Sequence, residues 1–150
     1  MSALLAITAE GFFLDKSILQ AYRETDYLVH ATRPFTLRID EVCAECDTLM
    51  DALRVSTAAY VAAWNPYSQR RSSAENARAQ NALAAELAAH CISVLDGVGT
   101  GRIGGWPPEP SLFALGISRD KAVSLARKYQ QNAFVWIERS KAAELVFSAW

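Results

Sequence analysis

The fold is decided by residues 55–64, Val-Ser-Thr-Ala-Ala-Tyr-Val-Ala-Ala-Trp, a stretch that carries no charged side chain. Its apolar and partly β-branched composition is typical of a central strand that is buried on both faces. The turn signal Asn65-Pro66 ends the strand. Ser72 and Glu75 then form a capping box, which predicts the start of an alanine-rich helix over 73–89.

Between this helix and the C-terminus, the pattern predicts strands at 91–95, 111–116 and 133–137 and a helix at 119–129 capped by Ser118. From residue 55 the order is therefore strand, helix, strand, strand, helix, strand. This is the βαββαβ order of the ferredoxin-like core, in which the sheet is antiparallel and both helices pack on one face. Residues 141–150 are expected to add a final strand or a short helix.

Toward the N-terminus, the sequence predicts a helical lead within 1–26 and a hairpin of strands at 27–31 and 35–39. A helix over 40–53 follows, with Asp40 as its N-cap and Val42 in its buried stripe. The fold class expected for residues 1–150 is α+β, a single domain with a mixed or antiparallel sheet, in which an N-terminal helix, hairpin and helix precede the βαββαβ core.

Composition narrows the classes of partner and the compartment. The 150 residues hold 15 Lys and Arg against 16 Asp and Glu, and this balance argues against binding to duplex nucleic acid. No apolar stretch approaches the length of about 20 residues that spans a bilayer, so no membrane partner is expected. Three cysteines and an N-terminal segment without a basic n-region favour a cytoplasmic protein.

The predicted topology brings four segments to one edge of the sheet. They are the turn at 64–68, the N-terminus of the helix at 73, the loop at 97–110 and the turn at 130–132. These segments also hold most of the chain's special polar residues and glycines. The sequence therefore places a candidate site at this edge.

The chemistry of that edge favours a small anionic or nucleotide-like ligand. Two arginines precede a helix N-terminus, where free amides and the helix dipole attract anions. Glu109, between two prolines, is the candidate acid or base. The expected ligand-binding residues are Trp64, Asn65, Ser68, Arg70, Arg71, Asn76, Trp106, Gln131 and Asn132. The alternative is that these residues only cap helices and stabilise turns. No pattern in the sequence identifies a cofactor.

Cysteine and histidine suggest no metal site. Cys43 and Cys46 form a CxxC pair, but the neighbouring carboxylates should raise the thiol pKa values, which is unfavourable for redox chemistry. Zinc would need further ligands, and His90-Cys91 is the only other compact pair. We interpret the cysteines, His30 and His90 as structural.

Three sequence blocks resemble a family of small bacterial domains of unknown function. The family pattern consists of a W-N-P-x-S turn followed by an Asn in the next helix, a W-x-E-P-S element, and a Q-x-A element before a strand. The matching residues are Trp64-Asn65-Pro66-Tyr67-Ser68 with Asn76, Trp106-Pro107-Pro108-Glu109-Pro110-Ser111 with one additional proline, and Gln131-Asn132-Ala133. The resemblance covers residues 22–138. It implies no particular activity, and it indicates that the polar blocks act together.

Two classes of function remain open. One is a small-ligand site at the sheet edge, with Glu109 able to assist chemistry. The other is a non-enzymatic interaction or regulatory module, in which the apolar segment 145–150 favours a homodimer.

Overall fold

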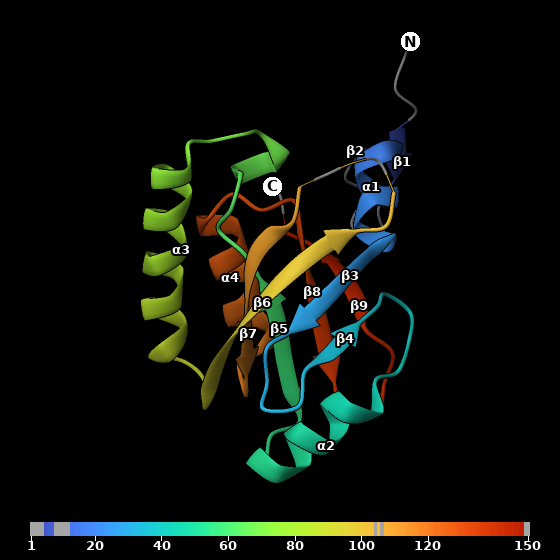
Figure 1. Cartoon of the computed structure of the whole chain (residues 1–150), viewed down its shortest axis with the longest axis vertical. Helices are drawn as coiled ribbons and strands as arrows, with labels where there is room; N and C mark the ends of the chain where they lie inside the picture. Colours follow the sequence, from blue (N-terminus) through green and yellow to red (C-terminus); the bar gives the residue numbers. More distant parts are fainter. Residues whose placement is uncertain (1–4, 8–12, 104, 106, 149–150) are drawn as a thin grey trace.

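The computed structural model describes residues 5–7, 13–103, 105 and 107–148 (Figure 1). Its elements, in chain order, are β1 (Leu5–Ile7), β2 (Phe13–Asp15), α1 (Lys16–Arg23), β3 (Thr25–Val29), β4 (Phe35–Leu37), α2 (Ala44–Leu53), β5 (Thr57–Val61), the 3-10 turn η1 (Pro66–Ser68), α3 (Ser73–Ala88), β6 (Ser93–Gly101), β7 (Glu109–Leu115), α4 (Arg119–Lys128), β8 (Ala133–Glu138) and β9 (Glu144–Phe147).

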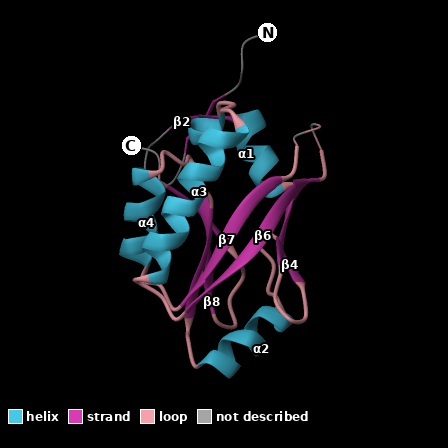
Figure 2. Cartoon of the chain, turned by 60° about the vertical axis from the view of Figure 1, so that its left-hand side comes forward, coloured by secondary structure: helices cyan, strands magenta, loops and turns pink. Residues whose placement is uncertain are grey.

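The architecture is α+β, with one curled antiparallel sheet of seven strands in the order β4-β3-β6-β7-β5-β8-β9 (Figure 2). The predicted hairpin is present as β3 and β4, which pair Tyr27 with Leu37. The strands β3 and β4 extend the sheet on one side of β5 to β8, and β9 extends it on the other. The whole sheet is curled into a half-barrel (Figure 2).

Alternation along each strand divides the core between two faces of the sheet. On β5, Ala58 and Tyr60 face the inner side, which α2 closes at one end with Cys46 and Met50. Ala59 and Val61 face the outer side. There they pack with the helices α3 and α4, which lie together on that face (Figure 2). The sequence prediction that both helices cover one face is confirmed.

The predicted N-caps of α3 and α4 are confirmed. Ser72 Oγ accepts a hydrogen bond from the Glu75 amide at 3.1 Å and donates to the Glu75 carboxylate at 2.9 Å. Ser118 Oγ accepts from the Lys121 amide at 3.2 Å. Within the described residues, no helix combines the length and the apolar character needed to cross a membrane.

The predicted start of α2 at Asp40 is wrong. The helix begins at Ala44 with Cys43 as its N-cap, and Asp40 adopts a φ of 67°. The Asp40 amide donates to the Ala143 carbonyl at 2.8 Å, so this part of the chain is tied to the segment before β9 instead of entering the helix. Val42 therefore lies outside the helix and is 59% exposed.

The predicted helical lead over residues 1–26 is also wrong in part. The helix α1 spans only Lys16–Arg23, and β1 and β2 form a small hairpin before it. Antiparallel pairing of Leu5 with Asp15 satisfies backbone groups that a longer helix would have used. Residues 1–4 and 8–12 of the predicted lead lie outside the described residues.

The glycine-rich segment 97–110 is not a loop along its whole length. Strand β6 continues to Gly101 and β7 begins at Glu109. Gly99 pairs with Tyr27 of β3 on one side and with Glu109 of β7 on the other. Because neighbouring strands satisfy its backbone on both sides, this segment remains a strand despite the low strand propensity of glycine.

Candidate functional site

A cavity of about 340 Å³ occupies the inner face of the half-barrel, at the end away from α2. Its walls come from α1, from the strands β3, β5, β6, β7 and β8, and from the turn 64–68. Pro107 and Pro108 contribute where the chain enters β7. Figure 1 shows α1 at the end of the sheet away from α2, and the cavity is at that end because α1 and the central strands supply its lining residues.

Glycines on β6 leave the space that the cavity occupies. Gly99 lies opposite Tyr27 and Glu109 and lines the cavity without a side chain to fill it. Gly97, two residues earlier on the same face, accommodates the Tyr60 hydroxyl. A Cβ at Gly97 would lie 2.4 Å from the Leu28 carbonyl oxygen and 2.8 Å from that hydroxyl.

Three tyrosines surround the cavity, and each hydroxyl has a protein partner. Tyr27 donates to the Tyr22 carbonyl at 2.6 Å, and Tyr60 donates to the Leu28 carbonyl at 3.0 Å. The Tyr22 hydroxyl hydrogen-bonds with Ser68 and Asn132. Burial raises the pKa of all three hydroxyls, so they remain neutral near physiological pH. The tyrosines thus form neutral, amphipathic walls.

Among the described residues that line the cavity, Glu109 is the only one with an acidic or basic side chain other than tyrosine. Its side chain forms no hydrogen bond or ion pair with the described residues, while its backbone carbonyl accepts from Ser111 Oγ at 3.2 Å. Burial among the tyrosines raises the pKa of the Glu109 carboxyl to about 7. The residue as a whole is partly exposed toward the cavity. Glu109 is therefore present both as carboxylic acid and as carboxylate near neutral pH.

This pKa predicts a pH-dependent cost in stability. Below pH 4.5, its ordinary value, Glu109 is protonated in both states; as the pH rises toward 7, the unfolded chain ionises first and the folded state loses relative stability. Because solvent in the cavity screens part of the penalty, we expect a loss of about 1–2 kcal/mol in the free energy of unfolding. Urea unfolding of wild type and Glu109→Gln at pH 4 and pH 8 measures it. The variant should be the more stable protein at pH 8 only, and a constant difference across this range would contradict the assignment.

The turn at 65–68 forms one wall and holds an unusual backbone conformation. Asn65, Tyr67 and Ser68 have φ values of 46°, 52° and 60°. Each non-glycine residue in this region costs of order 1–3 kcal/mol, and such residues persist only where their surroundings hold them. Strained backbone of this kind is concentrated at functional sites.

Buried amides hold this turn in place. The Asn76 side chain, on α3, accepts from the Asn65 amide at 2.9 Å and donates to the Asn65 side chain at 2.8 Å. Gln131 donates to the Trp64 carbonyl at 3.3 Å, and Asn132 donates to Ser68 Oγ at 3.1 Å. All three amides are at least 93% buried, because their exposed fractions are 3%, 7% and 5%.

The structure brings together some of the residues predicted from the sequence and separates others. Five line the cavity: Trp64, Asn65, Ser68, Glu109 and Gln131. Asn76 and Asn132 lie behind them as supports. Arg70 and Arg71 are exposed and do not line the cavity, because the chain after η1 leads away toward α3. Trp106 lies outside the described residues.

The three tyrosines of the cavity were not among the site residues predicted from the sequence. Tyr22, Tyr27 and Tyr60 lie inside a predicted helix and two predicted strands, where aromatic residues are ordinary core candidates. The sequence feature that could have indicated the cavity is the set of alternating glycines on β6, Gly97, Gly99 and Gly101. Because these residues lie on the inner face of β6, no side chain fills the space beside Tyr27 and Tyr60.

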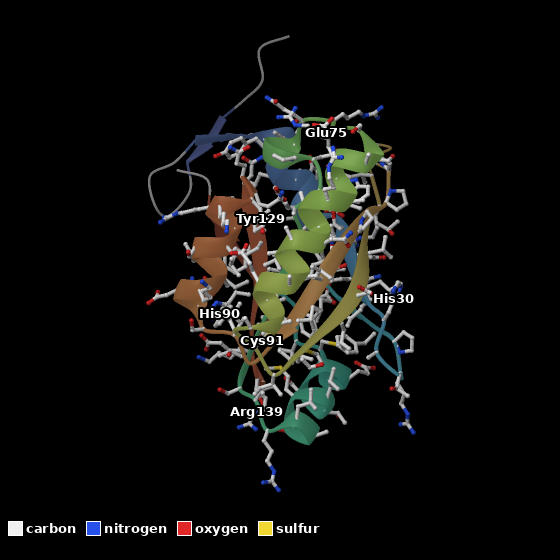
Figure 3. The ribbon with its side chains drawn as sticks, turned by 90° about the vertical axis from the view of Figure 1, so that its left-hand side faces the viewer. His30, Glu75, His90, Cys91, Tyr129 and Arg139 are labelled. Carbon is white, nitrogen blue, oxygen red and sulfur yellow. The ribbon has the colours of Figure 1, made fainter. Side chains whose placement is uncertain are left out.

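The cysteines and histidines lie away from the cavity lining. Burial raises the pKa of the Cys46 thiol to about 12, so the thiol stays protonated at neutral pH. His90 and Cys91 lie at the C-terminal end of α3, opposite Glu75 at its start, and His30 lies on another part of the molecule (Figure 3). Among the described residues, no three His, Cys, Asp or Glu side chains are grouped so as to hold a metal ion.

A comparison with protein-family models matches the central part of the chain. Residues 61–134 match the family described as Protein of unknown function (DUF3293). The DUF3293 match includes the strained turn, α3, Glu109 and Gln131, while Tyr22, Tyr27 and Tyr60 lie outside it. No curated protein and no solved structure matched the chain.

Proposed function

We propose that this protein binds a small organic molecule in the cavity at the mouth of the half-barrel. The observation that carries the proposal is the Glu109 carboxyl, which lies in an aromatic cavity and has no partner among the described residues. Burial raises the pKa of this carboxyl, so its ionised form lowers the stability of the fold, and its presence in a cavity is better explained by function than by stability. A concave, largely apolar space with few polar groups is also the usual form of a small-molecule site.

The strained turn supports the same proposal. Three non-glycine residues of this wall adopt the left-handed conformation, which costs free energy of folding, and Asn76, Gln131 and Asn132 hold them there. Such a conformation is best explained if the shape of the wall serves ligand binding. We infer that the three sequence blocks act together for this reason: the first forms the wall, the second supplies Glu109, and the third holds the wall in place.

An anionic ligand, which the sequence favoured, has less support. Arg70 and Arg71 would have to bind it, but both are exposed and neither lines the cavity. The described lining contains no lysine, arginine or histidine. We therefore propose a ligand that offers hydrogen-bond donors to Glu109 and apolar surface to the tyrosines.

A second candidate function is acid–base catalysis by Glu109. Its pKa of about 7 is near the value at which a carboxyl transfers protons most effectively in neutral solution. In this role Glu109 would exchange a proton with the bound ligand, while the strained turn would hold the ligand in position.

The homodimer alternative has less support than the sequence suggested, and Ala149 and Trp150 of the segment 145–150 lie outside the described residues. Val146 and Ser148, in the apolar C-terminal segment, are 5% and 0% exposed because they pack within the protein's own sheet region.

We also infer that β5 to β8 with α3 and α4 form a ferredoxin-like core, a proposal supported by the antiparallel order β6-β7-β5-β8. Three free thiols support our inference that the protein acts in the cytoplasm.

Binding of benzyl alcohol, a neutral probe that fits the cavity, tests the proposed function. In ¹H–¹⁵N spectra we expect the amides of Thr25, Gly99 and Ser111 to shift on titration. The Gly99→Val variant, whose new side chain enters the cavity beside Thr25 and Tyr27, should lose this response while its melting curve remains cooperative. Shifts outside the cavity, or none at all, would contradict the proposal.

A further inference from the structure

The polar groups of the cavity are not equally available to a ligand. The hydroxyls of Tyr22, Tyr27 and Tyr60 all hydrogen-bond within the protein. The Gln131 amide donates to two backbone carbonyls, those of Trp64 and Tyr129. The Glu109 carboxylate, in contrast, has two acceptor oxygens and no partner among the described residues. The Glu109 carboxylate can therefore accept hydrogen bonds from a ligand that carries a donor group.

The negative charge of the Glu109 carboxylate also favours a ligand group that is a positively charged donor. Glu109 is the only residue of the described lining that becomes charged near neutral pH. Arg102 lies seven residues before Glu109 in the chain but does not line the cavity. It pairs instead with the carboxylates of Glu24 and Asp26, at 3.6 and 3.2 Å. A ligand that brings a positive charge would supply the missing counterion.

The aromatic walls suit a cation with an apolar body. Tyr22, Tyr27, Tyr60 and Trp64 all line the cavity. Aromatic rings attract ammonium groups through their quadrupole, and aromatic-lined sites are a common way to bind them. The same rings offer apolar contact to the rest of a compact ligand.

We propose, on the basis of the proposed function of the cavity, that its ligand is a small organic cation, with an ammonium group against Glu109 and an apolar body against the tyrosines. A charge-assisted hydrogen bond from the ammonium to the carboxylate then joins the contacts with the rings. Anionic molecules of the same shape are excluded, because they would place a second negative charge beside Glu109.

This inference predicts how affinity depends on pH. The titratable groups that face Glu109 are Tyr22, Tyr27 and Tyr60, and all three stay neutral because burial raises their pKa values. The only lining group that titrates near neutrality is therefore Glu109 itself, with a pKa of about 7. Affinity for the cation should increase as the pH rises from 6 to 8, since the carboxylate is the form that binds it.

Three probes of similar shape test the inference: benzylammonium, benzyl alcohol and benzoate, each titrated into the full chain at pH 8 and followed by ¹H–¹⁵N shifts. We expect benzylammonium to bind about tenfold more tightly than benzyl alcohol, with benzoate the weakest. In Glu109→Gln, which keeps the shape of the side chain, benzylammonium should lose this advantage. In Glu41→Gln, an exposed residue outside the cavity that changes the net charge equally, the advantage should remain.

The outcomes separate this inference from the function on which it rests. If benzyl alcohol binds in the cavity and benzylammonium binds no more tightly, or benzoate binds best, the cation inference is overturned and the small-ligand function stands. If none of the probes shifts the cavity amides, both are overturned. An advantage for benzylammonium that survives in Glu109→Gln would also overturn the inference, because the carboxylate would not be its cause.

Discussion

The variant Gly97→Ala is expected to lose about 3 kcal/mol of unfolding free energy, the largest effect that we predict for a single added methyl group. The new Cβ would lie 2.4 Å from the Leu28 carbonyl oxygen, which belongs to the backbone of the paired strand and cannot rotate away. It would also approach the Tyr60 hydroxyl, which donates its hydrogen bond to that same oxygen. Relief of the clash must therefore separate β3 from β6 or break the Tyr60 hydrogen bond.

The matched control is Gly99→Ala, two residues along the same face of the same strand. Its Cβ would have its nearest contact at 3.5 Å, with the Thr25 methyl group, which is an ordinary van der Waals distance. We expect Gly99→Ala to change the unfolding free energy by less than about 1 kcal/mol, as for a tolerated glycine substitution. Guanidinium unfolding of both variants measures the difference. Equal stability of the two variants would show that Gly97 is not required for the close approach of β3.

Asn76→Ala is expected to lose about 2–4 kcal/mol, because it removes a buried amide and leaves its partners unpaired. The Asn65 amide loses its acceptor, and the Asn65 side chain and the Arg71 carbonyl lose a donor. The effect should reach the cavity as well: without Asn76 the turn 65–68 can relax from its left-handed conformation, and binding of benzyl alcohol should weaken. Thermal unfolding and the same ¹H–¹⁵N titration measure the two effects.

Asn81→Ala separates this effect from helix propensity. Asn81 is exposed on the same helix, so its replacement should stabilise α3 slightly, by about 0.5 kcal/mol. If Asn76→Ala and Asn81→Ala had similar stabilities, the contacts of Asn76 with the turn would carry no net energy. If Asn76→Ala were unstable but bound the probe as wild type does, the turn would not depend on Asn76 for its shape.

Local signals in the sequence predicted much of the fold. The capping serines, Ser72 and Ser118, act within one helical turn, so their hydrogen bonds follow from the sequence alone. The extended and apolar segments at β5, β7 and β8 also follow from composition and alternation. The start of α2 did not follow, since Asp40 is held by the distant Ala143 carbonyl.

The candidate site was predictable only where it depends on chain order. The βαββαβ order brought the turn 64–68 near residues 130–132, and hydrogen bonds from Gln131 and Asn132 connect these segments. The cavity itself depends on which residues face each other across β3, β6 and β7, a register that no local pattern fixes. The exposure of Arg70 and Arg71 could not be predicted from the sequence either, because it depends on the direction of the chain after η1.

The pH titration of the Glu109 carboxyl carbon by ¹³C NMR, with and without saturating benzylammonium, tests whether this carboxyl is buried in the cavity and binds the cation. The resonance is assigned by its absence in Glu109→Gln. We predict a midpoint near pH 7 for the free protein and a lower midpoint when benzylammonium is bound, because the cation stabilises the carboxylate. A midpoint near the ordinary value of 4.5 in both samples would contradict the account, since Glu109 would then be neither buried in the cavity nor in contact with the ligand.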